Sequence, residues 1–327
     1  MTDLTTEYTH TPVMFEETIE LLSAKPGSIV VDATLGRAGH GKVLARTAMT
    51  GGGTYIGIDL DRQAIAAAQP ILEELQTEIG SGEFLLLQGS FGDLDSLLAD
   101  AGIPYVNTFL FDVGVSSPQI DDVSRGFSFK NDAFLDMRMD QDAQTPTAAA
   151  LLASLDEKEL TRIFRIYGEE KWASRIASFV VKQRADVPIE TSSQLVEVIK
   201  AAIPASARRA GGHPAKRSFQ ALRIAVNDEL GALESGLEAA IRWLYTGGRI
   251  GVLTFHSLED RIVKNAFKQA SEQKCECQPN MPLCMCENKA VLRVLTKRPL
   301  QPTAAEIEEN PRSRSTKLRV AEKIDQE

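Results

Sequence analysis

Glycines and acids in the first third of the chain are spaced as in a nucleoside-binding site. Gly36, Gly39 and Gly41 follow an apolar, β-branched run and precede a helical pattern. A strand that turns through glycines into a helix brings backbone N–H groups and the positive end of the helix close to a ligand. The next apolar run ends on Asp59, and an acid there can accept both hydroxyls of a ribose. The spacing therefore predicts a site for a nucleoside cofactor.

The order of the glycines separates the candidate cofactors. A dinucleotide fold has G-x-G-x-x-G in this turn, whereas the chain has G-x-x-G-x-G from Gly36 to Gly41. The glycines that a pyrophosphate needs are misplaced, which favours S-adenosylmethionine because its sulfonium end has no phosphate. Asp59 would hold the ribose, Phe91 would lie against the adenine, and the carboxylate of Asp112 would support the positive sulfonium.

Two other interpretations of these residues stay open on spacing alone. One is a dinucleotide cofactor bound in spite of the glycine order. The other is that the chain binds no cofactor here and that the acids only cap the helices that follow them, which is the role we expect of Asp61 and Asp93.

The elements that must position these residues alternate between strands and helices. The expected strands are residues 29–31, 55–59, 84–90 and 106–114, and a helical pattern follows each of the first three. Such alternation predicts an α/β fold with a doubly wound, mostly parallel, Rossmann-like sheet. Ligands bind over the carboxyl ends of the strands in such a sheet, which is where Asp59 and Asp112 fall.

The alternation of strands and helices stops near residue 118. Between residues 118 and 212 the apolar spacing is helical, and strand patterns resume at residues 247–256, 290–295 and 317–323. We therefore expect a discontinuous methyltransferase-type domain, residues 1–117 and 213–327, interrupted by an all-helical insertion, residues 118–212.

Composition places the chain among globular proteins. Its 327 residues are 25% charged and 43% hydrophobic, enough for one large or two modest domains. No apolar run can span a bilayer, and the acidic, polar N-terminus is not a signal peptide, so we expect a cytoplasmic protein. The net charge of −9 argues against broad nucleic-acid binding but leaves room for a local basic face.

Two stretches without acids supply such a face. Between Lys200 and Asn227 there are six Lys or Arg residues and no acid. The residues of this stretch that we expect to bind nucleic-acid phosphates are Arg208, Arg209, Lys216 and Arg217. A second acid-free run consists of Arg312, Arg314, Lys317 and Arg319. The alternative for both stretches is a solvated basic surface without a ligand.

Four cysteines form two C-x-C pairs, at Cys275, Cys277, Cys284 and Cys286. Four reduced thiols at this distance could bind zinc tetrahedrally. The spacing is tighter than that of the usual C-x-x-C knuckle, so uncoordinated or redox-sensitive thiols are the alternative. We predict no metal in the active site itself.

Several longer motifs resemble those of one family. They are Asp112-Val-Gly-Val-Ser-Ser-Pro-Gln119, Arg125-Gly-Phe-Ser-Phe129, Leu135-Asp-Met-Arg-Met-Asp140, Tyr167-Gly-Glu-Glu170, His213-Pro-Ala-Lys-Arg-Ser-Phe-Gln220, Phe255-His-Ser-Leu-Glu-Asp-Arg261 and Asn310-Pro-Arg-Ser-Arg314. Together they resemble the bacterial RsmH (MraW) family, which consists of S-adenosylmethionine-dependent methyltransferases. The resemblance implies N4-methylation of a cytidine, position 1402, in the 16S rRNA of the small ribosomal subunit, near the decoding centre.

The resemblance also implies which residues contact the cofactor: Ala38, Gly39, His40, Asp59, Phe91, Asp112 and Gln119. The chain departs from the family in the first turn, where Gly-Arg-Gly-Gly-His is usual and Ala38 replaces the third residue. Because alanine tolerates positive φ poorly, we expect a negative φ at Ala38 if its backbone contact with the cofactor is kept.

The chemistry requires a group that holds the amine and a group that receives its proton. A cytosine amine is a poor nucleophile because its lone pair is delocalised into the ring, so it must be aligned with the methyl group and relieved of a proton. Asp112 is the first catalytic candidate. His256, at the end of a later strand, is a rival base, and its alternative is a packed, hydrogen-bonded histidine.

The expected partner is 16S rRNA within the small ribosomal subunit, with no membrane contact. Oligomeric state stays open, with a homodimer as one option. A non-catalytic ribosome assembly or RNA-binding factor is the alternative from another class of protein. A DNA amino-methyltransferase is disfavoured because its Asp/Asn-Pro-Pro-Tyr loop is replaced here by the motif that begins at Asp112.

Overall fold

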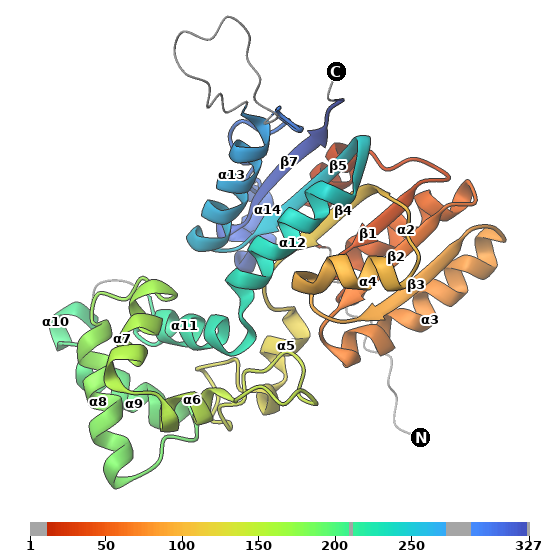
Figure 1. Cartoon of the computed structure of the whole chain (residues 1–327). Coiled ribbons are helices and arrows are strands. Elements are labelled where there is room, and N and C mark those ends of the chain that lie inside the picture. The colour runs from red at the N-terminus through yellow and green to blue at the C-terminus, as the bar shows by residue number, and fades with distance from the viewer. Residues whose placement is uncertain (1–11, 209–211, 273–288, 326–327) are drawn as a thin grey trace, which may run out of the picture. The chain divides into compact units, whose positions relative to one another are not determined.

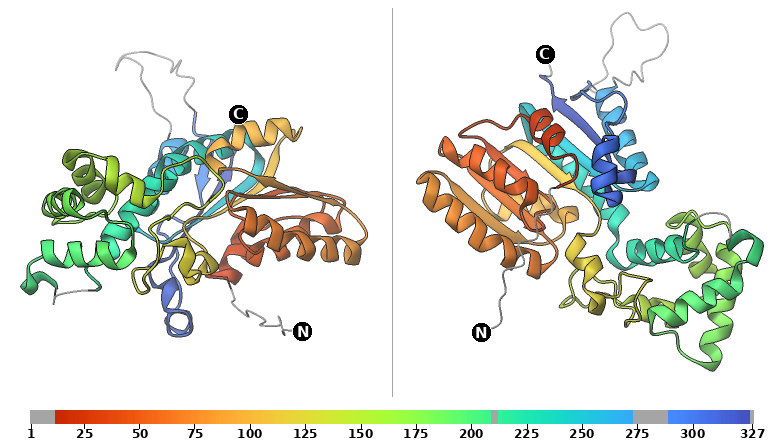
Figure 2. Two further views of the ribbon diagram at one scale, coloured as in Figure 1. Left: turned by 90° about the horizontal axis from the view of Figure 1, so that it is seen from below. Right: turned by 180° about the vertical axis from the view of Figure 1, so that it is seen from behind.

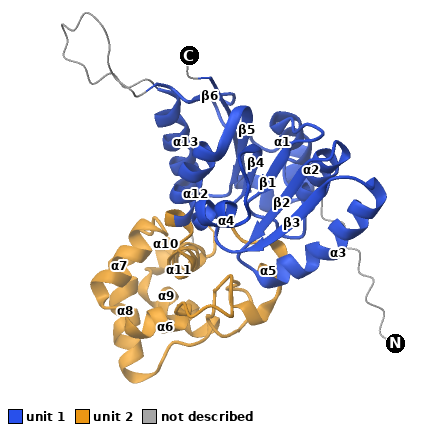
Figure 3. Cartoon of the chain, turned by 45° about the vertical axis from the view of Figure 1, so that its right-hand side comes forward, with its two compact units in different colours: residues 1–113, 232–327 blue, residues 114–231 orange. Residues whose placement is uncertain are grey.

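The chain folds into two units, seen in a computed structural model that describes residues 12–208, 212–272 and 289–325 (Figure 1). Unit 1 contains residues 1–113 and 232–327, and unit 2 contains residues 114–231 (Figure 3). Unit 2 therefore extends beyond residue 212, where we expected the insertion to end. The reason is that Phe219 and Leu222, in the next helix, belong to its hydrophobic core.

Unit 1 is built on a seven-stranded sheet in the order β3-β2-β1-β4-β5-β7-β6. The strands are β1 (Ile29–Asp32), β2 (Thr54–Asp59), β3 (Glu83–Gln88), β4 (Val106–Asp112), β5 (Leu244–Thr254), β6 (Leu292–Val294) and β7 (Lys317–Lys323). Strands β1 to β5 pair with one another in parallel, and β7 is antiparallel to both β5 and β6. The predicted doubly wound, mostly parallel sheet is confirmed.

Helices cover both faces of this sheet, because alternate strand residues point to opposite sides. Val31 and Phe109 pack with one set of helices, α4 (Leu94–Asp100), α12 (Glu229–Trp243) from residue 232 onward, and α13 (Ser257–Ser271). Val30 and Leu110 pack on the other face with α1 (Phe15–Leu22), α2 (Gly39–Thr50) and α3 (Arg62–Ile79) (Figures 1 and 2). Shorter elements are η1 (Phe91–Asp93), α14 (Ala304–Glu309) and η3 (Pro311–Ser315).

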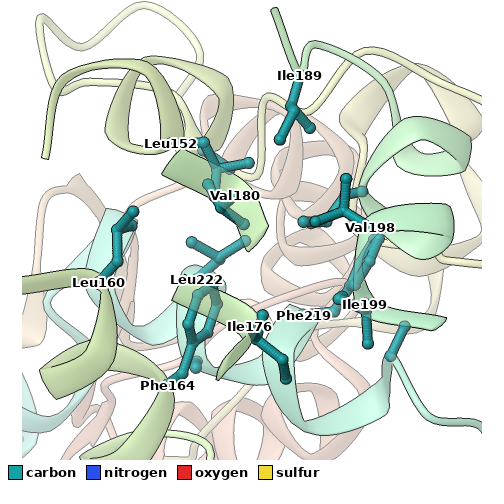
Figure 4. Close-up of a cluster of buried hydrophobic side chains, with 14 of the residues drawn as sticks. Leu152, Leu160, Phe164, Ile176, Val180, Ile189, Val198, Ile199, Phe219 and Leu222 are labelled. Atoms are coloured by element: carbon teal, nitrogen blue, oxygen red, sulfur yellow. The ribbon is translucent and has the colours of Figure 1, made fainter. Parts of the chain in front are cut away.

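The regular secondary structure in the described residues of unit 2 is helical, apart from an isolated bridge between Phe134 and Thr191. Its elements are α5 (Ser117–Asp121), η2 (Val123–Arg125), α6 (Ala148–Ser154), α7 (Glu157–Ile166), α8 (Ala173–Asp186), α9 (Ser192–Ala202), α10 (Ala205–Arg208) and α11 (Lys216–Asn227). Side chains from five of these helices meet in one core, including Leu152, Phe164, Ile176, Ile199 and Leu222 (Figure 4). Among the helices described in either unit, none has the length and apolar character needed to cross a membrane.

Candidate cofactor and substrate site

The carboxyl ends of β1 and β4 mark the point where the strand order of unit 1 reverses. β2 and β3 lie on one side of β1, and β5 lies on the far side of β4. Open α/β sheets bind ligands in the crevice at this point. Asp32 ends β1 and pairs in register with Leu110, two residues before Asp112 at the end of β4. Both carboxylates therefore lie at the ligand-binding edge of the sheet.

Asp59, at the end of β2, is held by the glycine turn. Its Oδ2 accepts a hydrogen bond from the Gly36 N–H at 2.8 Å, and its Oδ1 accepts one from the Asp61 N–H at 2.8 Å. Burial raises the pKa of Asp59 to about 6, although these backbone hydrogen bonds oppose the rise. Gly36 has φ +52°, and among the atoms of the described residues a Cβ placed there would meet only the Thr34 carbonyl oxygen, at 3.9 Å. The turn therefore fixes the acid and leaves open space above its own backbone.

Asp61 and Asp93 were both expected to cap helices, and only Asp61 does so through its side chain. Asp61 accepts a hydrogen bond from the Gln63 N–H at the start of α3, at 2.9 Å. Asp93 is the N-cap residue of α4 but makes no side-chain cap hydrogen bond. The prediction for Asp93 is wrong because η1 continues directly into α4, so its side chain has no separate turn to close.

Ala38 has a left-handed backbone, so the expectation of a negative φ is wrong. Its φ is 56° and its ψ is 37°, and it is the N-cap residue of α2. Its N–H donates to the Leu35 carbonyl at 2.8 Å, and its methyl group is buried at 2% exposure. These contacts impose a conformation that costs an L residue about 1–2 kcal/mol. Ala38 also makes no side-chain cap hydrogen bond to α2, which begins at Gly39 and His40.

His40 is fixed from three sides. Its Nδ1 lies 3.5 Å from Oδ2 of Asp112, and its Nε2 lies 3.2 Å from the Val13 carbonyl oxygen. The ring also stacks on Phe15, with centroids 5.7 Å apart. Burial lowers the pKa of His40. The hydrogen bond to Asp112 and the negative charges of Asp112 and Asp32 raise it by more, so the pKa of His40 lies above its ordinary value. A positive His40 would therefore be balanced by the acids at the ends of β1 and β4.

Asp32 and Tyr55 belong to the same site, and sequence reasoning missed both. The Tyr55 hydroxyl donates to Oδ2 of Asp32 at 3.0 Å, and the Thr34 N–H donates to Oδ1 at 3.2 Å. Burial raises the pKa of Asp32 to about 6 and raises that of Tyr55 well above its ordinary value. The sequence could have identified Asp32 as a site residue, since it ends an apolar run as Asp59 does. It could not have identified Tyr55, because that residue lies inside an apolar strand.

The pair formed by Asp32 and Tyr55 explains why residue 41, the last glycine of the turn, has no side chain. A Cβ on Gly41 would lie 2.3 Å from the Tyr55 hydroxyl oxygen and 3.1 Å from Oδ2 of Asp32. Gly41 is therefore required where α2 passes over the buried acid, and its role is packing against protein atoms.

Asp112 is more accessible than Asp32, the other acid near His40. Its side chain is 29% exposed, compared with 4% for His40. Its backbone N–H donates to Oγ1 of Thr34 at 2.6 Å, so Thr34 bonds to both β1 and β4. Phe91 opens η1 in the same unit, and its ring meets Phe111 edge-on, with centroids 5.8 Å apart. Packing thus holds the aromatic ring that was expected to face the adenine.

His256 acts as a helix cap. It is the N-cap residue of α13, where its Nδ1 accepts from the Glu259 N–H at 3.4 Å. Its Nε2 lies 2.9 Å from Oε1 of the buried Glu259. Both ring nitrogens therefore face Glu259, which favours the packed histidine over the rival base.

Gln119 lies in unit 2, where it closes the first turn of α5. Its side-chain oxygen accepts from the Ser116 N–H at 2.9 Å, while its own N–H donates to Oγ of Ser116 at 3.4 Å. This reciprocal capping box buries Gln119 to 8% exposure.

The predicted RNA-binding residues fall in unit 2 where they are described. Arg208, Lys216 and Arg217 are exposed, and Arg217 donates to the Glu169 carbonyl at 3.1 Å. Arg209 lies outside the described residues, as do Cys275, Cys277, Cys284 and Cys286. In the second basic run, Lys317 and Arg319 instead bind Asp260, at 2.8 and 2.7 Å. The acid that pairs with both of them comes from α13, so the linear sequence concealed it.

Comparison with known proteins gives consistent matches over nearly the whole chain. The model of the MraW methylase family matches residues 7–324. The "Ribosomal RNA small subunit methyltransferase H" of Paenibacillus sp. (strain JDR-2) is 48% identical over 323 residues, covering 97% of this chain and 100% of the relative. The protein of the same name from Geobacter sulfurreducens is 50% identical over 317 residues, covering 97% and 99%. That from Symbiobacterium thermophilum is 47% identical over 315 residues, covering 96% of each chain.

Proposed function

The chain belongs to the MraW methylase family, and we propose that it methylates the N4 amine of a cytidine in small-subunit ribosomal RNA. It is a methyltransferase, and its methyl donor is S-adenosylmethionine. The nucleotide implied by the sequence resemblance is position 1402 of the 16S rRNA. The observation that best supports this function is the accessible acid, Asp112, beside His40 at the point where the strand order reverses.

The residues of unit 1 fit the methyl donor. Asp59 keeps lone pairs for ribose hydroxyls beyond its two backbone hydrogen bonds. The space above Gly36 is open, and Ala38 and Gly39 present an uncapped start of α2, which suits the carboxylate of an amino-acid moiety. Bound S-adenosylmethionine would supply a methyl group activated by a sulfonium. We propose that the ring of Phe91 lies against the adenine of the cofactor.

Asp112 is the residue to which we assign contact with the amine. Accepting a hydrogen bond from the cytosine N–H would turn the amine lone pair out of the ring plane and toward the methyl group. The carboxylate would then take up the proton that the nitrogen must lose. His40, at 3.5 Å, keeps this carboxylate oriented and lies too deep to reach a substrate itself. Asp32 is buried, at 2% exposure, so we propose that it supports Asp112 and His40 without touching the substrate.

Unit 2 supplies the candidate RNA-binding surface. The acid-free basic stretch is exposed at Arg208, Lys216 and Arg217. Replacing these three and Arg209 by neutral residues should weaken RNA binding and reduce its salt dependence, while cofactor binding to unit 1 stays intact. The net charge of −9 favours the small subunit over naked RNA as the substrate, because a local site and its shape must then provide recognition.

The test is methyl transfer to small subunits purified from a strain that lacks this activity. With labelled S-adenosylmethionine we expect one methyl group per subunit, located on a cytosine amine when the modified nucleotide is mapped. Cofactor binding without transfer to RNA or DNA would favour the assembly-factor alternative. Transfer to a DNA duplex but not to the subunit would favour the DNA amino-methyltransferase.

Two substitutions separate Asp112 from its rival. Asp112→Asn removes the proton acceptor and should abolish most transfer, provided that calorimetry still detects cofactor binding. His256→Asn keeps a side-chain acceptor for the start of α13 but removes the imidazole, so its activity should stay close to that of the parent protein. Loss of activity in His256→Asn with unchanged stability would instead assign the base to His256.

A further inference from the structure

Three aromatic rings in unit 2 form a continuous stack that leads from the core to the surface. Phe219, in α11, is buried at 4% exposure in the hydrophobic core. Phe129 is half-buried and meets Phe219 edge-on, with centroids 5.7 Å apart and planes at 80°. His213 is exposed and lies face to face on Phe129, with centroids 4.4 Å apart and planes at 12°. The outermost ring therefore rests on a ring that is itself packed against the hydrophobic core.

His213 is held in one orientation by a second contact. Its Nδ1 accepts a hydrogen bond from the Ala215 N–H at 3.3 Å, just before α11 begins. In the neutral ring this contact assigns the proton to Nε2. Burial against its neighbours and the charge of Lys200 lower the pKa of His213, so the imidazole is neutral at physiological pH. The result is a flat, uncharged ring with one face covered by Phe129.

The charges around this ring suit a polyanion. The His213 carbonyl accepts a hydrogen bond from the Lys216 N–H at 3.1 Å, and the exposed Lys216 and Arg217 begin the helix α11 that follows this turn. Arg208 precedes it on α10, and the acid-free stretch of the sequence runs through all of these positions. Unpaired RNA bases bind on exposed aromatic rings, including histidine, where nearby cations hold the phosphates.

We propose that the outer face of His213, supported by Phe129, is a stacking platform for an unpaired base of the ribosomal RNA substrate. This inference rests on the proposed function and deepens it, since it assigns a base-binding role to a position outside the methyl-transfer site. The base stacks on the ring, Lys216 and Arg217 bind the flanking phosphates, and the Nε2–H is available as a donor to the base edge. Every base has a π-face, so the platform contributes affinity with little sequence preference.

A merely structural role for His213 predicts a different result, and two substitutions distinguish the roles. His213→Asn keeps an acceptor for the Ala215 N–H but removes the ring. His213→Trp keeps and enlarges the ring but removes that acceptor. If the ring binds a base, His213→Asn should raise the apparent KM for small subunits about 5- to 150-fold with little change in kcat, and His213→Trp should bind like the parent protein.

The assay uses the full-length chain with saturating S-adenosylmethionine and small subunits from the strain that lacks the activity. Calorimetric cofactor affinity and thermal unfolding of each variant are measured in parallel. An unchanged KM in His213→Asn overturns the proposal, as does an equal loss of affinity in His213→Trp. Failure of the parent protein to methylate the subunit would instead refute the proposed function.

Ultraviolet cross-linking of the parent protein to the same subunits identifies what touches the ring. We expect the peptide that contains His213 to carry a nucleotide, and we expect this adduct to disappear in His213→Asn. A cross-link from that peptide to a ribosomal protein, with no nucleotide adduct, would show that the ring contacts protein and would overturn the base-stacking assignment.

Discussion

The hydroxyl of Tyr55 donates a hydrogen bond to Oδ2 of Asp32 across 3.0 Å, and both side chains are closed to solvent. Oδ1 of the same carboxylate accepts from Thr34, whose hydroxyl accepts from the Asp112 N–H. One chain of hydrogen bonds thus joins β2, β1 and β4 at the ligand-binding edge. Since Asp112 also lies beside His40, the Asp32–Tyr55 pair supports the two residues at the centre of the proposed site.

Tyr55→Phe tests the buried pair directly. The substitution keeps the ring and leaves a buried carboxylate without one of its donors, so the free energy of unfolding at pH 7.5 should fall by about 1–3 kcal/mol. The Tyr55 hydrogen bond lowers the pKa of Asp32, which burial has raised to about 6. Without it the pKa rises further, so the deficit should grow as pH rises through 6 and shrink at pH 5, where the acid is protonated. Urea unfolding at both pH values measures this.

Tyr105→Phe is the matched control, because Tyr105 is 41% exposed. Its unfolding free energy should change by less than about 0.5 kcal/mol at either pH. A Tyr55→Phe deficit that is the same at pH 5 and pH 7.5 would show that Asp32 does not titrate in this range.

Gly41→Ala tests why the turn ends on glycine. Alanine is favoured over glycine inside a helix by about 1 kcal/mol, so an unhindered substitution would stabilise the protein. The new Cβ would instead lie 2.3 Å from the Tyr55 hydroxyl oxygen, and we expect a loss of about 1–3 kcal/mol. Gly212→Ala should be nearly neutral, because a Cβ there meets no atom of the described residues within 4 Å.

The double variant Gly41→Ala/Tyr55→Phe identifies the colliding atom. Tyr55→Phe removes the oxygen that the new methyl group meets, so the combined loss should be smaller than the sum of the single losses by about 1 kcal/mol or more. Strict additivity would mean that the Gly41→Ala penalty arises elsewhere in α2.

Because we assign the ribose hydroxyls of the cofactor to Asp59, we expect cofactor affinity to depend on pH. Its pKa is about 6, so the acid is mostly neutral at pH 5 and mostly ionised at pH 7. Ribose hydroxyls donate best to the ionised form, and the affinity for S-adenosylmethionine should therefore rise about tenfold between pH 5 and pH 7. Calorimetric titration over this range measures it. Asp59→Asn should bind more weakly and lose most of this rise; an undiminished rise would assign the titration to another group.

The sequence was sufficient for features that repeat locally along the chain. Strands that end on Asp59 and Asp112 were recognisable from apolar runs, as was the helical character of residues 118–212. It was insufficient where side chains from distant segments meet. The partner of Arg319 is Asp260, on another element, and Tyr55 reaches Asp32 only because β2 pairs in register with β1. The end of unit 2 was misplaced for the same reason, since only packing shows that α11 belongs to its core.

Ala38→Gly tests the backbone strain in the turn that leads into α2. Alanine at φ 56° is disfavoured by about 1–2 kcal/mol, and glycine adopts this conformation freely. Loss of a buried methyl group, about 0.8 kcal/mol, and the greater freedom of the unfolded chain, about 0.4–1 kcal/mol, offset most of the gain, so we expect the free energy of unfolding in urea to stay within about 0.8 kcal/mol of the parent value. Ala45→Gly is the matched control, because Ala45 is equally buried inside the same helix but has no positive φ. It should lose about 1 kcal/mol or more. If both variants lose the same stability, the left-handed conformation at Ala38 carries no strain in solution.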